Sequence, residues 1–173
     1  MHNISTTTIL LILAILFALL AGYYTFFHSA KKKKPVNIPK DDFAPVRLQA
    51  YERLILLMER ISPSELVMRY AGQGGSVSDL QLLLLGAIRA EMEHNYTQQL
   101  YVSSRTWDYV IAARNGISTI INQAATELQP EDSAIALSKK IIELAAAEPS
   151  SPTATAIKML KAEAQAILLQ KQG

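Results

Sequence analysis

The chain has 173 residues, no cysteine and a formal net charge of +2. The lack of cysteine excludes disulfides, cysteine-ligated zinc, iron–sulfur sites and cysteine nucleophiles. Residues 1–30 carry no charged side chain, and five of the 17 basic residues are lysines between positions 31 and 40, so residues 41–173 hold 12 basic against 15 acidic residues, a net charge of −3. Because a nucleic-acid-binding domain normally carries positive charge on its folded body, we expect no nucleic-acid partner. Nothing in the composition predicts a cofactor.

The first apolar segment covers residues 9–27 and follows a short tail, residues 1–8. Its 19 residues would span most of a hydrocarbon core of about 30 Å as a helix. A basic collar, consisting of Lys31, Lys32, Lys33 and Lys34, follows it. The positive-inside rule then predicts a single-pass protein of the inner (cytoplasmic) membrane, with the N-terminus outside and the C-terminal domain in the cytoplasm. A cleaved signal peptide is disfavoured because the positive charge lies on the wrong side of the apolar run.

Three closely spaced prolines interrupt the next segment. Pro35, Pro39 and Pro45 bias residues 28–45 against helix, which predicts an extended basic spacer. Residues 46–173 show apolar periodicity typical of helices, so we expect an all-α bundle with a central antiparallel helix hairpin. The predicted helices cover residues 46–61, 63–71, 78–100, 104–128, 131–148 and 152–170.

Serines mark three of the predicted helix starts. Ser62 precedes Pro63, and with Glu65 it forms the pattern of a capping box. Ser78 is expected to begin the third helix. Ser103 is expected to be the N-cap of the fourth, which places the turn of the hairpin near residues 102–103.

Polar residues replace apolar ones where the two hairpin helices meet their turn. The apolar stripe of the third helix continues into polar side chains, and an arginine interrupts the stripe of the fourth. Residues equidistant from the turn should face each other, which predicts an ion pair between Glu91 and Arg114. The expected polar cluster comprises Glu91, His94, Asn95, Gln98, Trp107 and Arg114.

Such a cluster has three interpretations. It could be a buried pair that fixes the register of the helices, a partner-binding surface at the end of the bundle, or a catalytic or metal site. The spacing of Glu91 and His94 is the Glu-x-x-His spacing of di-iron bundles, but those bundles need a second copy, which the chain lacks. We therefore assign no catalytic, cofactor-binding or metal-ligating residue.

Two stretches, residues 51–61 and 91–107, carry a resemblance together with the N-terminal apolar segment. They resemble a family of small, uncharacterised membrane-anchored helical proteins of the Bacteroidota, with a domain of unknown function. The resemblance covers residues 45–128. It implies a bacterial inner-membrane setting and transfers no functional residue.

The function that these patterns favour is a non-enzymatic, membrane-tethered helical adaptor or scaffold. Its expected partners are the lipid bilayer and either another protein or further copies of the chain. Two alternatives stay open. One is a membrane-bound metalloenzyme with a site around Glu91 and His94, and the other is a membrane-surface protein that associates with anionic lipid through its lysines.

Overall fold

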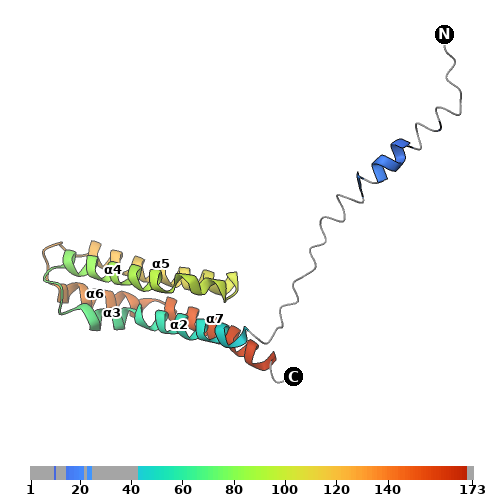
Figure 1. The fold of residues 1–173 in the computed structure, drawn as a ribbon. Coiled ribbons are helices and arrows are strands. Elements are labelled where there is room, and N and C mark those ends of the chain that lie inside the picture. Colours follow the sequence, from blue (N-terminus) through green and yellow to red (C-terminus); the bar gives the residue numbers. More distant parts are fainter. Residues whose placement is uncertain (1–9, 11–14, 22, 25–42, 171–173) are drawn as a thin grey trace, which may run out of the picture. The chain divides into compact units, whose positions relative to one another are not determined.

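The computed structural model describes residues 10, 15–21, 23–24 and 43–170. The chain divides into two units, Met1–Pro39 and Lys40–Gly173. Every regular element described in the second unit is a helix (Figure 1), which confirms the prediction of an all-helical bundle. The four lysines of the predicted basic collar and most of the predicted spacer lie outside the described residues.

The predicted transmembrane helix over residues 9–27 is not supported. Within the parts of the chain that the structure describes, no helix is both long enough and apolar enough to cross a membrane. Within that segment the structure describes residues 10, 15–21 and 23–24, all of them helical. The rest of the segment, residues 9, 11–14, 22 and 25–27, lies outside the described residues.

The helices of the bundle agree closely with those expected from apolar periodicity. The predicted third helix is divided, because its last turn is a 3₁₀ helix. The elements are α2 (Ala44–Arg60), α3 (Pro63–Tyr70), α4 (Val77–Asn95), the 3₁₀ helix η1 (Tyr96–Leu100), α5 (Ser104–Thr126), α6 (Ala134–Ala147) and α7 (Pro152–Gln170).

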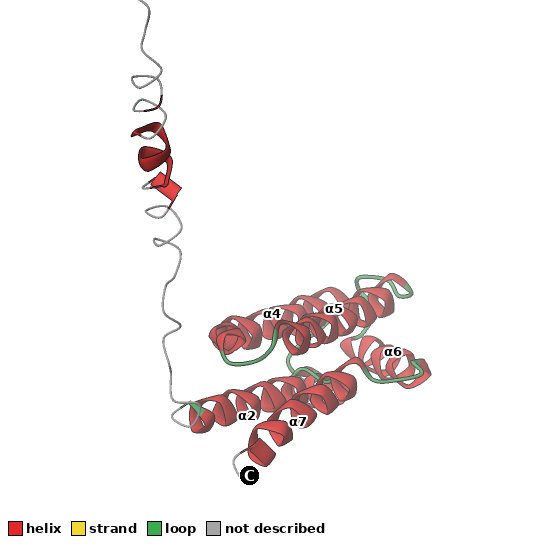
Figure 2. Cartoon of the chain, turned by 90° about the vertical axis from the view of Figure 1, so that its right-hand side faces the viewer, coloured by secondary structure: helices red, strands yellow, loops and turns green. Residues whose placement is uncertain are grey.

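The bundle has two layers. Helices α4 and α5 lie side by side and antiparallel in one layer, as the hairpin prediction required, and α2, α3, α6 and α7 form the other (Figures 1 and 2). In that second layer α2 packs against α7, and α3 packs against α6. Apolar side chains from both layers fill the interior. The largest fully buried ones are Tyr51, Leu54, Leu57, Met58, Ile61, Leu66, Leu80, Leu84, Ile88, Ile117, Ile121 and Leu137.

Helix starts follow the serines, with two corrections, at α4 and at the capping box expected for α3. The Ser103 side chain accepts a hydrogen bond from the Thr106 backbone N–H, as an N-cap does. The N-cap of α4 is Ser76 and not Ser78: its hydroxyl accepts from the Asp79 N–H at 3.2 Å and donates to the Asp79 carboxylate at 2.8 Å. Ser62 occupies the N-cap position of α3, but its side chain makes no capping hydrogen bond.

Close packing of α5 on α7 depends on a glycine. A Cβ atom built on Gly116 would lie 3.0 Å from Cγ and 3.2 Å from Cβ of Pro152, the first residue of α7. The absence of a side chain therefore lets the start of α7 approach α5. By contrast, a Cβ on Gly86 in α4 would meet nothing within 4 Å.

Candidate functional site

The two sides of α4 carry different charged sites, and the polar cluster expected from the sequence is divided between them. Glu91, His94 and Asn95 line a pocket together with Arg53 and Arg60 of α2. Arg114 lies elsewhere, in a groove between α4 and α5. The hairpin brings these residues to the same level of the bundle but not to the same side of α4.

Glu91 is paired with arginines of the second layer, so the predicted Glu91–Arg114 ion pair is wrong. Its Oε1 accepts a hydrogen bond from Arg60 Nε at 2.6 Å and lies 3.6 Å from Arg69 Nη1. Arg69 also donates from Nη2 to the Arg60 carbonyl at 2.9 Å. One carboxylate thus joins the end of α2 and the end of α3 to α4.

The error arises from rotation about the helix axis and not from position along it. Successive helical residues are about 100° apart around the axis. Met92, the next residue after Glu91, does line the α5 side with Arg114. Pairing residues by their distance from the turn therefore predicted, to within one residue, the position along α4 that lies opposite Arg114. The difference of one residue places Glu91 on the side of α2 and α3.

His94 and Asn95 belong to the Glu91 side. His94 is exposed, whereas Asn95 is buried and donates from Nδ2 to the Glu91 carbonyl at 2.9 Å, closing the last turn of α4. No group of three or more His, Asp or Glu side chains among the described residues is arranged to hold a metal ion. The Glu91 carboxylate of the Glu-x-x-His pattern is instead engaged by the guanidinium groups of Arg60 and Arg69.

Gln98 and Trp107 occupy the turn of the hairpin. Gln98 is buried within η1. Trp107 is half-buried and meets the ring of Tyr96 edge to face, with ring centroids 5.7 Å apart and an interplanar angle of 87°. This geometry is favourable for an aromatic pair, and Tyr96 in turn lines the groove between α4 and α5.

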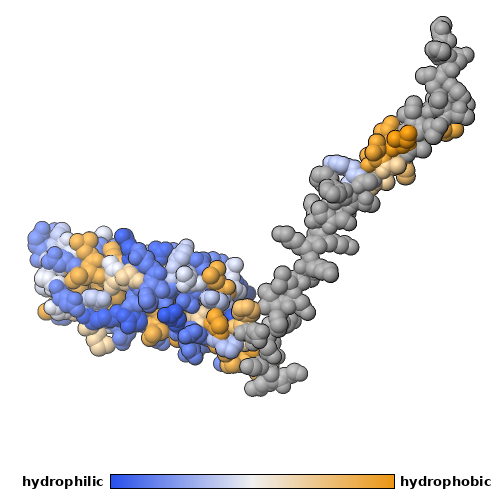
Figure 3. Space-filling view, in the orientation of Figure 1, coloured by the Kyte–Doolittle hydropathy of each residue, from blue (hydrophilic) through white to orange (hydrophobic). Residues whose placement is uncertain are grey.

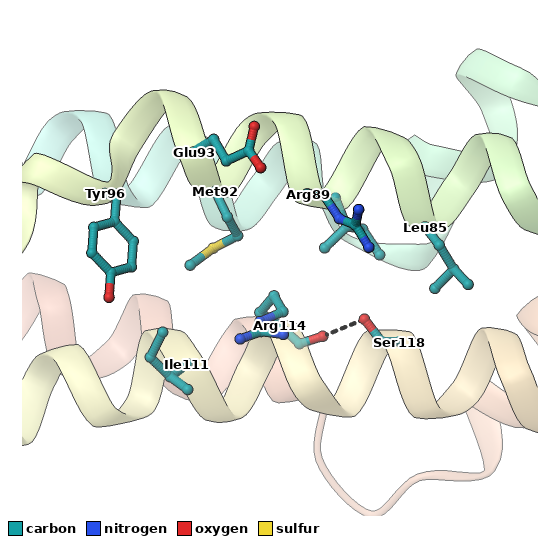
Figure 4. A pocket seen from close by; sticks show the side chains of 9 residues that line it. Leu85, Arg89, Met92, Glu93, Tyr96, Ile111, Arg114 and Ser118 are labelled. Carbon is teal, nitrogen blue, oxygen red and sulfur yellow. Dashed lines mark hydrogen bonds between the residues drawn. The ribbon is translucent and has the colours of Figure 1, made fainter.

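The groove between α4 and α5 combines charged side chains with apolar walls. Its volume is about 330 Å³. Figure 4 shows side chains of both helices lining it, with Met92 and Ile111 near Tyr96 and Leu85 at the opposite end. Arg89 of α4 and Arg114 of α5 lie between these apolar ends.

Neither arginine of the groove has a carboxylate partner among the described residues. The basic residues that form ion pairs in the described part of the chain are Arg47, Arg60, Arg69 and Lys140. Glu93 also lines the groove, but it forms no ion pair with either arginine. Two guanidinium groups against one carboxylate leave the lining with a net charge of +1, although residues 41–173 as a whole carry −3.

A second polar network, which the sequence analysis missed, holds the turn of the hairpin against α2 and α7. Glu163 of α7 accepts hydrogen bonds from the Tyr51 hydroxyl at 2.8 Å, the Ser103 N–H at 2.9 Å and the Ser103 hydroxyl at 2.8 Å. Arg47 donates from Nε to the Tyr101 carbonyl at 3.2 Å. The carboxylate therefore caps the start of α5 from another helix, and a contact across 60 residues leaves no local signal in the sequence.

These contacts shift two ionisation equilibria. Burial raises the pKa of Tyr51 to about 12, and the hydrogen bond to Glu163 adds to the shift. Burial alone would raise the pKa of Glu163, but hydrogen bonds from Thr106, Tyr51 and Ser103 outweigh it and hold that pKa below its ordinary value. Near neutral pH the pair is therefore a neutral phenol donating to a charged carboxylate.

Polar residues dominate the visible face of the bundle, with separate apolar patches among them (Figure 3). The most exposed leucine on α4 is Leu82, whose accessible fraction is 70%. It belongs to a shallow, almost wholly apolar depression with Tyr70 and Gly86. This depression lacks charged side chains, which distinguishes it from the groove of Arg89 and Arg114.

Comparison with known proteins gives a family but no described activity. No curated protein and no solved structure matches the chain. A family profile matches residues 2–167, which is nearly the whole sequence. This match confirms the resemblance to an uncharacterised family: the chain belongs to the DUF7935 family of unknown function.

Proposed function

We propose that the helical bundle is a non-enzymatic adaptor that docks another protein in the groove between α4 and α5. The observation that carries the proposal is the pair formed by Arg89 and Arg114, which have no carboxylate partner among the described residues and stand beside apolar walls. The Bacteroidota setting suggested by the sequence remains part of the proposal.

The residue types of the groove support docking. Arginine, tyrosine, tryptophan and methionine are enriched in protein–protein interfaces, and the first three dominate their energetic hot spots. The groove presents Arg89, Arg114, Tyr96 and Met92 together. Trp107 packs edge to face against the ring of Tyr96.

The other two candidate functions have less support. A metal ion at Glu91 would have to displace Arg60 and Arg69 from the carboxylate. The anionic-lipid hypothesis depends on Lys31–Lys34, which lie outside the described residues.

The test is site-specific photo-cross-linking of the full-length protein in the cells that make it. Benzoylphenylalanine replaces Ile111, which is half-buried in the groove, or Ile135, which is exposed on α6 and serves as the matched control. Circular dichroism checks that both proteins keep their helix content. Mass spectrometry then identifies the cross-linked species.

The adaptor proposal expects one protein to be cross-linked from position 111 and not from position 135, and Arg114→Ala in the position-111 protein to reduce its yield. Equal labelling from both positions would contradict docking in the groove. Cross-links from position 111 only to small molecules, lipid or nucleic acid would also contradict it.

A further inference from the structure

We propose that the segment docked in the α4–α5 groove is acidic: a peptide stretch whose carboxylates pair with Arg89 and Arg114 and whose apolar side chain packs on Met92 and Ile111. This inference rests on the proposed function and names the chemistry of the partner. It follows from the charge of the groove, the placement of its apolar walls and the charge of the bundle around it.

The charges of the groove favour a carboxylate ligand. Arg89 and Arg114 lie on the two helices that border the groove (Figure 4), and like charges that share one depression repel each other. Elsewhere in the bundle, Arg60 and Arg69 both form ion pairs with one carboxylate, that of Glu91. In the groove, Glu93 forms no ion pair with either arginine, so a ligand that supplies carboxylates would give both guanidinium groups a partner.

The two arginines differ in exposure. Arg114 is half-buried, whereas Arg89 is exposed. Guanidinium groups bind carboxylates through paired, charge-assisted hydrogen bonds that strengthen as water is excluded. We therefore expect the carboxylate at Arg114 to contribute most of the affinity and the one at Arg89 mainly to increase the association rate.

Apolar walls lie on both sides of the two arginines. Met92 and Ile111 lie on the Tyr96 side of the arginines, and Leu85 lies on the other side. A volume of about 330 Å³ is at the lower end for a site that encloses a whole ligand. It suits a few side chains of a longer chain, with acidic residues next to an apolar one.

The negative charges of the groove and of the bundle disfavour a polyanion as the ligand. Glu93 lines the groove, so its carboxylate would repel a nucleic-acid or polyphosphate backbone. The net charge of −3 on residues 41–173 acts in the same direction at longer range. A peptide with two carboxylates and neutral neighbours experiences the two arginines with less of this repulsion.

The experiment selects binders from a random dodecapeptide display library on the immobilised full-length protein. Counter-selection uses the Arg89→Glu/Arg114→Glu double variant, which reverses the groove and leaves the rest of the chain unchanged. Arg105→Glu makes the same charge change at an exposed position of α5 outside the groove and is the matched control. Thermal unfolding establishes that all variants fold.

Peptides that depend on the groove are expected to carry two or more Asp or Glu next to an apolar residue. Their affinity should fall about tenfold or more with Arg114→Glu and remain near wild type with Arg105→Glu. Replacing the peptide carboxylates with amides should produce a similar loss, and added salt should weaken binding.

Two results would overturn the inference while leaving the adaptor proposal standing. One is enrichment of groove-dependent peptides without acidic residues. The other is failure to enrich any arginine-dependent peptide although position 111 cross-links one protein in cells. If position 111 cross-links no protein specifically, the adaptor proposal itself fails, so the two failures are distinguishable.

Discussion

Charged residues of the same kinds lie on both sides of α4, but in the described part of the chain they are paired on one side and unpaired on the other. On the side of α2 and α3, Glu91 lies between Arg60 and Arg69, and its side chain is only 16% accessible. On the side of α5, Arg89 and Arg114 share a groove without a paired carboxylate. A completed ion cluster holds helices together, whereas an incomplete one leaves charge available for a partner. Substitutions on the first side should therefore change stability, and substitutions on the second should change binding.

The largest expected effect is at the completed cluster. Glu91→Ala removes the shared carboxylate and leaves two guanidinium groups facing each other. The pair is only partly buried, so we expect a loss of about 2 kcal/mol in the free energy of unfolding, between the values typical of exposed and buried pairs. Urea denaturation of the purified protein measures it.

Glu93→Ala is the matched control, since Glu93 lies on the groove side two residues later and forms no ion pair with a described residue. We expect it to change stability by less than about 0.5 kcal/mol. Equal losses for the two variants would remove the distinction between the two sides of α4.

The next largest effect is expected at Glu163. It tests whether the hydrogen bonds of Glu163 stabilise the fold as the ion pairs of Glu91 do. Glu163→Gln weakens hydrogen bonds from Tyr51 and Ser103, and we expect a loss of about 1.5 kcal/mol near neutral pH. Because the folded-state pKa of Glu163 lies below its ordinary value of 4.5, the stabilisation is present above that value and is lost as the pH falls through the folded-state pKa. Stability measured against pH should therefore converge for wild type and variant in acid.

Tyr51→Phe checks the other end of the same hydrogen bond, with the opposite dependence on pH. The pKa of Tyr51 rises from 10.0 to about 12, so its contribution is complete below pH 10 and is lost as the pH rises through about 12. The wild type should lose stability relative to Tyr51→Phe over that interval. A constant difference between the two proteins from pH 9 to 12 would show that the phenol is not held protonated by the fold.

A pair of glycine substitutions compares a packed helix face with an open one. Gly116→Ala introduces a Cβ close to Pro152, and the steric overlap should outweigh the gain in helix propensity, lowering stability by about 1 kcal/mol. Gly86→Ala meets no neighbour and should raise stability by about 0.5–1 kcal/mol. Thermal denaturation compares the two, and a gain at both positions would mean that α7 can shift to accommodate the new methyl group.

The smallest expected effect is the most specific to the groove. Arg89→Ala and Arg114→Ala remove no ion pair among the described residues, and they relieve the repulsion between the two guanidinium groups. We expect each to change the free energy of unfolding by less than about 0.5 kcal/mol. A loss above about 1.5 kcal/mol for Arg114→Ala in urea denaturation would indicate that this arginine serves stability.

Most of the helices could be predicted from the sequence because their causes are local. Apolar residues at helical spacing, Pro63 at the start of α3 and Ser103 before α5 act within a few residues of the positions that they determine. The antiparallel hairpin, and the position along α4 that lies opposite Arg114, also follow from the lengths of α4 and α5. The start of α4 was misplaced because two serines, Ser76 and Ser78, offer the same capping chemistry, and Ser76 is the one whose hydroxyl pairs with Asp79.

By itself, then, the sequence determined the all-helical class, the approximate helix limits and the family, since these depend on local patterning. It did not determine the partner of Glu91, because Arg60 and Arg69 reach it only after α2 and α3 have packed on one side of α4. Tertiary structure likewise decided that Glu163 caps α5 and that Arg89 and Arg114 share a groove. The physical reason is common to all three: rotation about a helix axis by one residue changes a side chain's neighbours, and only packing between distant segments fixes that rotation.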